Sequence, residues 1–294
     1  MLKSILVASD LSTRSKPAVQ RGALLAKAHR ARLCVLNVVD DNFAGDRIYA
    51  KVARIEHDLA THVEGFGKPA DFAVAVRGGH TFKTISEEAH TRAADLIIMG
   101  AHRRQVLRDV FVGTTIERVI RTAGRPVLMA NSKTGERWRK VLVTTDLSDV
   151  SSDAARTAHR LGFLEDVRVS FAYGYAPVTR HMMTHAGIPE ERIRQEIERE
   201  SQTARKDLTK FVERLGLGER NYSAHVFDGV GADAIEELVE DSKPDLLVIG
   251  TRGLSGVQRL FLGSVAQDLM GRLEIDVLAV PPISPEYIGL KISS

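Results

Sequence analysis

The stretch ILVASDLS, at residues 5–12, returns as VLVTTDLS at residues 141–148. Two further pairs follow in the same order: DLIIMG at 95–100 matches DLLVIG at 245–250, and FVGTT at 111–115 matches FLGSV at 261–265. The first pair is offset by 136 positions and the later two by 150, so the second half carries 14 additional residues between its matching ends. Duplication of one unit is the economical explanation of this self-similarity.

The length of 294 residues fits two domains of ordinary size. The repeat places the first domain at 1–132 and the second at 139–282, followed by a tail at 283–294. The segment NSKTGERWRK, at 131–140, is polar and carries a glycine, as a linker should. We expect Trp138 to pack this linker against the rest of the chain.

Each half alternates short β-branched runs, typical of buried strands, with longer stretches that repeat apolar residues at helical spacing. This alternation predicts an α/β fold, in which right-handed crossovers build a doubly wound parallel sheet of five strands in each half. The strands are expected at 5–9, 32–39, 71–76, 96–100 and 127–130, and again at 141–145, 168–175, 223–227, 246–250 and 277–280. A long helix with one exposed face is expected at 190–215.

Composition and charge restrict the classes of function. The formal net charge is only +3 and basic residues are interleaved with acidic ones, so we expect no nucleic-acid partner. The apolar run at 5–8 is too short for a signal sequence or a membrane span, so we expect neither a leader nor a membrane anchor. A single cysteine, Cys34, lies in an apolar run and indicates a buried thiol in a reducing compartment, so a cytoplasmic location is expected.

A glycine-rich loop follows the fourth strand of the second half, in the stretch GTRGLSGVQRLFLGSVAQDLM at 250–270. Its spacing is G-x2-G-x9-G-S. Gly250 and Gly253 permit a tight turn whose N–H groups can cradle anionic oxygens. Gly263 and Ser264 then begin a helix, whose unpaired N–H groups and positive dipole end favour phosphate. The loop is therefore chemically suited to a polyphosphate, although strand ending and helix capping are the structural alternatives.

A first strand ending in aspartate, followed by G-x2-G-x9-G-[ST], resembles the ATP-binding branch of the universal stress protein family, and the resemblance covers nearly the whole chain twice. It implies an adenine nucleotide as ligand, ATP first and ADP or AMP as alternatives, with Mg²⁺ left open because one carboxylate is thin support for it. The aspartate would contact the nucleoside, the end of the second strand would meet adenine, and the glycine loop would hold the phosphates. The implied second-half residues are Thr145, Asp146, Gly174, Ile249, Gly250, Arg252, Gly253, Gly263, Ser264 and Val265.

The corresponding first-half residues are Asp10, Val38, Gly100, Arg103, Gly113, Thr114 and Thr115. Here Arg103 stands where the second glycine of the loop belongs. The arginine could block the turn, or could itself bind a phosphate with help from Arg104 and Arg108. The resemblance further implies that the two fifth strands pair across a pseudo-twofold axis as an internal dimer, and it leaves a homodimer of tandem chains open.

Other candidate sites are weaker. His181 and His185 are spaced like metal ligands on a helix, but no third ligand lies near them in the sequence, so no metal site is assigned. The standard Walker loop, nucleophile elbow and Cys–His signatures are missing from the sequence, and no catalytic residue is assigned. The expected function is regulatory nucleotide binding with little or no turnover. A slow ATPase or phosphotransferase, and a dimerisation scaffold without nucleotide, are the alternatives.

Overall fold

The computed structural model describes residues 1–39, 47–67, 69–100, 114–132, 136–176, 189–218, 222–251 and 262–282. The predicted tail, as well as Arg103, Gly113, Arg252, Gly253, His181 and His185, lies outside these ranges. The described part is an α/β structure, as predicted. Its strands are β1 Ser4–Ala8, β2 Arg32–Val39, β3 Phe72–Gly78, β4 Leu96–Gly100, β5 Val127–Ala130, β6 Lys140–Thr145, β7 Arg168–Tyr175, β8 Ser223–Asp228, β9 Leu246–Gly250 and β10 Asp276–Val280.

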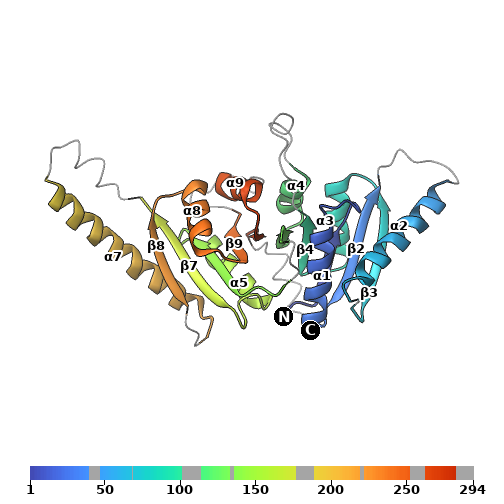
Figure 1. Cartoon of the computed structure of the whole chain (residues 1–294), viewed down its shortest axis with the longest axis horizontal. Coiled ribbons are helices and arrows are strands. Elements are labelled where there is room, and N and C mark those ends of the chain that lie inside the picture. Colours follow the sequence, from blue (N-terminus) through green and yellow to red (C-terminus); the bar gives the residue numbers. More distant parts are fainter. Residues whose placement is uncertain are drawn as a thin grey trace.

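The strands form one ten-stranded sheet in the order β3-β2-β1-β4-β5-β10-β9-β6-β7-β8. Every pair of neighbours is parallel except β5 and β10, which run antiparallel where the two halves meet, with Val277 opposite Met129. Each half thus contributes five parallel, doubly wound strands to one continuous sheet, and the fifth strands pair as expected. Figure 1 shows the two halves side by side along the long axis of the molecule.

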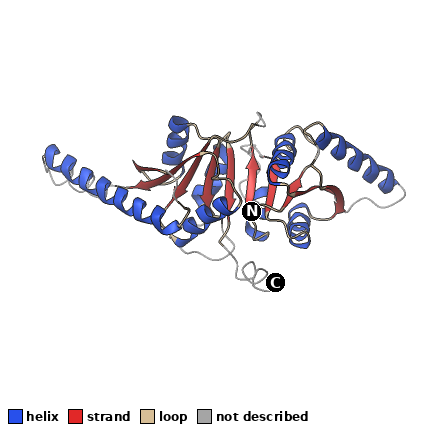
Figure 2. Cartoon of the chain, turned by 90° about the horizontal axis from the view of Figure 1, so that it is seen from below, coloured by secondary structure: helices blue, strands red, loops and turns tan. Residues whose placement is uncertain are grey.

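Helices cover both faces of the sheet, as Figure 2 shows. Side chains of α1 (Lys16–His29), α2 (Arg47–Glu64), α5 (Asp149–Arg160) and α7 (Glu190–Leu215) belong to one hydrophobic core. Those of α3 (Thr81–Thr91), α4 (Thr115–Thr122), α8 (Ala232–Ser242) and α9 (Ser264–Arg272) belong to a second core on the opposite face. The strands alternate between these cores because successive side chains point to opposite faces: Val7 joins the first and Leu6 the second.

Strand ends differ from the predicted ones by one or two residues. The first strand begins and ends one residue earlier than expected: Ser4 already pairs with Arg32 of β2, and Ser9 lies beyond the strand, where its hydroxyl hydrogen-bonds Ser15. β3 is longer than predicted, because Arg77 and Gly78 still pair with Val38 and Val39 of β2. The long helix α7 matches its predicted bounds, and Gly216, with φ of 62°, ends it in the left-handed conformation.

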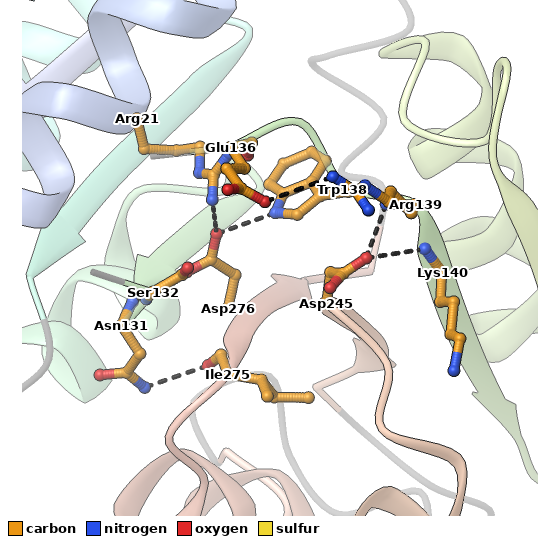
Figure 3. Close-up of polar contacts among 10 residues, drawn as sticks. All are labelled: Arg21, Asn131, Ser132, Glu136, Trp138, Arg139, Lys140, Asp245, Ile275 and Asp276. Atoms are coloured by element: carbon orange, nitrogen blue, oxygen red, sulfur yellow. Dashed lines mark hydrogen bonds and ion pairs between the residues drawn. The ribbon is translucent and has the colours of Figure 1, made fainter. Parts of the chain in front are cut away.

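The junction of the two halves is built around Asp276, the first residue of β10 (Figure 3). Its fully buried carboxylate forms an ion pair with Arg21 of α1 at 2.9 Å and accepts the Trp138 indole N–H at 2.9 Å. The same carboxylate accepts the backbone N–H groups of Asn131 and Ser132, just beyond β5. The expectation that Trp138 packs down the linker is confirmed, since its side chain is buried.

Candidate functional site

A cavity of about 270 Å³ lies at the carboxyl ends of β6 and β9 in the second half. In open α/β sheets, ligands bind beyond the carboxyl ends of the strands where the strand order reverses. β6 and β9 are adjacent, but the chain continues from β6 to β7 on one side and from β9 to β10 on the other, so the strand order reverses between β6 and β9. The predicted second-half residues that the structure describes all line this cavity: Thr145, Asp146, Gly174, Ile249, Gly250, Gly263, Ser264 and Val265.

Asp146 is held by a tight turn between β6 and α5. Leu147 takes a left-handed φ of 64°, and its N–H donates to the Thr145 hydroxyl at 2.9 Å. Both the N–H and the hydroxyl of Ser148 donate to Oδ1 of Asp146. The other carboxylate oxygen, Oδ2, is buried and finds no hydrogen-bond partner among the described residues. A buried carboxylate oxygen without a donor is costly, so this atom is suited to accept hydrogen bonds from a bound ligand.

The amino-terminal end of α9 forms another wall of the same cavity. Gly263 precedes the helix in an extended conformation, and its N–H donates to the Thr251 carbonyl at 2.8 Å. No side chain of the described residues caps this helix, and its first turn contains no acidic residue. The first N–H groups of a helix have no partner within the helix and attract anions. The wall therefore offers the features expected for a phosphate group.

Gly174, at the end of β7, lies beside a loop that the sequence interpretation did not single out. A Cβ atom at Gly174 would collide with the Gly229 carbonyl oxygen and the Phe227 ring. Gly229 and Gly231 have φ of 126° and 95°, and both line the cavity with Val230 between them. The sequence could have indicated this loop through the pattern G-V-G directly after a strand, because paired glycines often mark backbone that lies close to a ligand.

The first half has a corresponding cavity of about 210 Å³ at the carboxyl ends of β1 and β4. Asp10, Val38, Gly100 and Thr115 line it, whereas Thr114 caps α4. Burial acts to raise the pKa of the Asp10 carboxyl, but hydrogen bonds with Ser12 and Ser15 outweigh it and hold that pKa below its ordinary value. The structure thus places predicted residues of both halves around matching cavities.

Other kinds of site find little support in the described part of the chain. No group of three or more His, Cys, Asp or Glu side chains there is arranged to hold a metal ion. None of the described helices combines the length and apolar character needed to cross a bilayer. Cys34 is a buried free thiol, as predicted, and burial raises its pKa.

Fold and cavities define a tandem protein made of two doubly wound α/β halves, each with a cavity at its topological switch point. The model of the universal stress protein family matches residues 1–131 and 137–281. The chain therefore belongs to the universal stress protein family and carries two copies of its domain.

Individual relatives agree with this assignment. Over 159 residues, the chain is 32% identical to a universal stress protein of Methanocaldococcus jannaschii, covering 52% of this chain and 89% of that protein. It is 21% identical to universal stress protein E of Salmonella typhi over 96% of this chain and 95% of the relative. The crystal structure of a universal stress protein from Archaeoglobus fulgidus superposes with a TM-score of 0.70 at 17% identity, over 95% of this chain and 98% of that one, which supports the tandem fold.

Proposed function

We propose that the second half binds an adenine nucleotide, ATP in the first place, as a regulatory ligand in a stress response. The observation that carries the proposal is Oδ2 of Asp146, which lacks a hydrogen-bond partner among the described residues and lies in a cavity that also contains the start of α9, where no described side chain caps the helix. A nucleotide needs both features, because ribose hydroxyls donate hydrogen bonds and phosphates accept them.

The two ends of the cavity suit the two ends of a nucleotide. Thr145 and Asp146 belong to the β6 side, while Gly263 and Ser264 belong to the start of α9. The ribose would contact Asp146, the phosphates would receive N–H groups at the start of α9, and the base would lie toward Gly174. ADP and AMP fit the same description with fewer phosphates.

The proposed regulatory role requires only that the ligand binds and is not consumed. A ligand shifts a conformational equilibrium only by its difference in affinity between the states. The cavity lies in the half that joins the other through β10, the neighbour of β9. Nucleotide binding could therefore bias the assembly of the chain, including a homodimer of tandem chains, and the compartment proposed for this role is the cytoplasm.

Titration calorimetry with ATP on the full chain tests the proposal. Asp146→Asn keeps the shape but removes the charge that strengthens the ribose hydrogen bonds, so we expect a ten- to hundredfold weaker affinity, or about 1.5–3 kcal/mol. Gly263→Asp places a carboxylate at the phosphate end and should abolish binding. The control is Thr209→Ala on the exposed face of α7, which should leave the affinity unchanged.

The same samples separate the alternative functions. An absence of heat and of a melting shift at millimolar ATP would contradict nucleotide binding and favour a scaffold, because ligand at about 100 times its dissociation constant stabilises by about 2.7 kcal/mol. Multiple-turnover phosphate release that disappears in Gly263→Asp would instead establish a slow ATPase and contradict the non-enzymatic role.

A further inference from the structure

The two cavities differ in the size of the side chains that line them. The pairing of the strands shows which positions of the two halves are equivalent. Leu36 is equivalent to Ala172, because they lie opposite the equivalent residues Ala8 and Thr144. Val38 is equivalent to Gly174, and their neighbours on the next strand are Arg77 and Phe227. At four matched lining positions the first half has the larger residue: Leu36 for Ala172, Val38 for Gly174, Thr81 for Gly231 and Ile116 for Ala266. At two other matched positions the second half has the larger residue, Thr144 for Ala8 and Thr145 for Ser9, and the first cavity has about 210 Å³ against about 270 Å³ in the second.

The walls also differ in chemistry. Phe227 contributes an aromatic ring to the second cavity. Its first-half counterpart, Arg77, donates instead to Glu88 at 2.7 Å and is not part of the cavity lining. An aromatic ring favours a flat heteroaromatic ligand, because base–aromatic stacking contributes about 1–3 kcal/mol. Of the two cavities, the second is thus the larger and has an aromatic residue among its described lining.

The helix starts at the two cavities differ in the same direction. Thr114 and Glu117 form a capping box at the start of α4, in which the Thr114 hydroxyl accepts the Glu117 N–H and the Glu117 carboxylate accepts the Thr114 N–H. Two N–H groups at the start of α4 are therefore already satisfied, and a negative charge lies in its first turn. At α9 the matching residues are Ser264 and Gln267, and within the part of the chain that the structure describes no side chain caps the helix. The Glu117 carboxylate also accepts the Gln267 side-chain amide of α9 at 3.4 Å, so the difference between the helix starts is that the capping box occupies N–H groups at α4 that a phosphate would otherwise receive.

From these three differences we infer that the duplicated chain binds one adenine nucleotide, in its second half, and that the first half excludes it. The residues that determine this specificity are the four larger lining residues together with Glu117. The inference rests on the proposed nucleotide binding of the second half and adds which half is selective and why. The altered loop around Arg103 need not be the cause, because the described residues already disfavour both the base and the phosphates.

The number of ATP molecules bound per full-length chain is the first test. Equilibrium dialysis at ATP concentrations well above the dissociation constant should give one per chain. Two per chain, with the second half occupied, would overturn the exclusion while leaving the proposed function standing. Zero would overturn the proposed function and this inference together, so the two failures are distinguishable.

Exchanging the lining residues tests the cause. Ala266→Ile brings the first-half residue into the second cavity and should reduce the count from one to zero. Leu36→Ala combined with Ile116→Ala and Glu117→Gln opens the first cavity and removes the charge at α4, and should raise the count to two. A count that stays at one in the opened variant would show that these side chains do not cause the exclusion.

Folding is monitored in every variant by its thermal melt without ligand. Ile116→Val with Glu117→Gln is a milder first-half variant for the case that the opened cavity destabilises the domain. It removes the Glu117 charge but little side-chain volume. Dialysis at an ATP concentration ten times that of the first test should then reveal weak binding of a second ATP in the first half. Its failure to bind a second ATP at all, in a folded chain, would contradict the part assigned to Glu117.

Discussion

Replacing Asp276 by asparagine should destabilise the chain at the junction of its two halves. Asp276 is fully buried, and its carboxylate neutralises Arg21, of which only 5% of the side chain is exposed (Figure 3). The variant keeps the shape but leaves the arginine without a buried counter-charge. Breaking a buried ion pair in this way costs about 3–5 kcal/mol. The Arg21 guanidinium also donates to the Glu136 carbonyl at 2.6 Å and lies 4.8 Å from the centre of the Trp138 ring, so it cannot leave without further loss.

Chemical denaturation of the full chain, followed by tryptophan fluorescence, measures this loss directly because Trp138 is the only tryptophan and donates to Asp276. The matched control is Asp245→Asn. The Asp245 carboxylate also accepts two backbone N–H groups, those of Arg139 and Lys140, but it is only partly buried. We expect the control to lose about 1 kcal/mol.

A double variant tests whether the ion pair itself is responsible. Arg21→Met with Asp276→Asn removes both charges, and apolar replacement of a buried pair is often neutral, so the double variant should recover part of the stability lost in Asp276→Asn. A loss below about 1 kcal/mol in the single variant, or no recovery in the double, would refute the assignment of the junction's stability to this pair.

Three further predictions concern the rest of the fold. Gly174→Val should lower stability by about 1–3 kcal/mol in thermal melts, because its side chain would meet the Gly229 carbonyl and the Phe227 ring; an unchanged melt would contradict that contact. Cys34 should react slowly with a thiol reagent in the native chain and completely after unfolding, since burial raises its pKa; rapid native labelling would be inconsistent with the buried site. For Glu88, burial acts to raise the pKa, but hydrogen bonds from Arg92 and Arg77 outweigh it and lower it. Its contribution to stability is therefore present above the ordinary glutamate pKa of about 4.3 and is lost as the pH falls below that, so wild type and Glu88→Gln should converge in stability on acidification.

Much of the fold was predictable because it depends on local patterns. The repeated DLS segments, the β-branched runs and the helical spacing of 190–215 indicated the order of the elements and the sheet type. The pairing of β5 with β10 came from the family resemblance, since nothing in the short runs at 127–130 and 277–280 specifies a partner.

Contacts between distant parts of the chain were not predictable. The Asp276 junction brings together α1, the linker and β10, and its matching position in the first half is Pro126, so the repeat itself conceals it. Asp276 directly before an apolar run looks like an ordinary strand boundary. Only the three-dimensional arrangement shows that its carboxylate is buried beside Arg21.

The lining of the second-half cavity was predicted in part, and whether it is a binding site stays a prediction. Asp146, Gly263 and Ser264 were identified because first-strand aspartate and helix-opening glycine have recognisable spacing. Phe227 and the loop at 229–231 were missed, because their part in the cavity depends on the β7–β8 register. The capping box at Thr114 and Glu117 was present in the sequence as T-x-x-E, and weighing it would have indicated that the two helix starts differ.

A structure of the full chain crystallised with a non-hydrolysable ATP analogue tests the central claim most directly. The account predicts one nucleotide, bound in the second half, with its ribose on Asp146 and its phosphates at the start of α9, and a first-half cavity without nucleotide. Nucleotide bound in the first half, with or without the second, or none bound at saturating concentration, would contradict it.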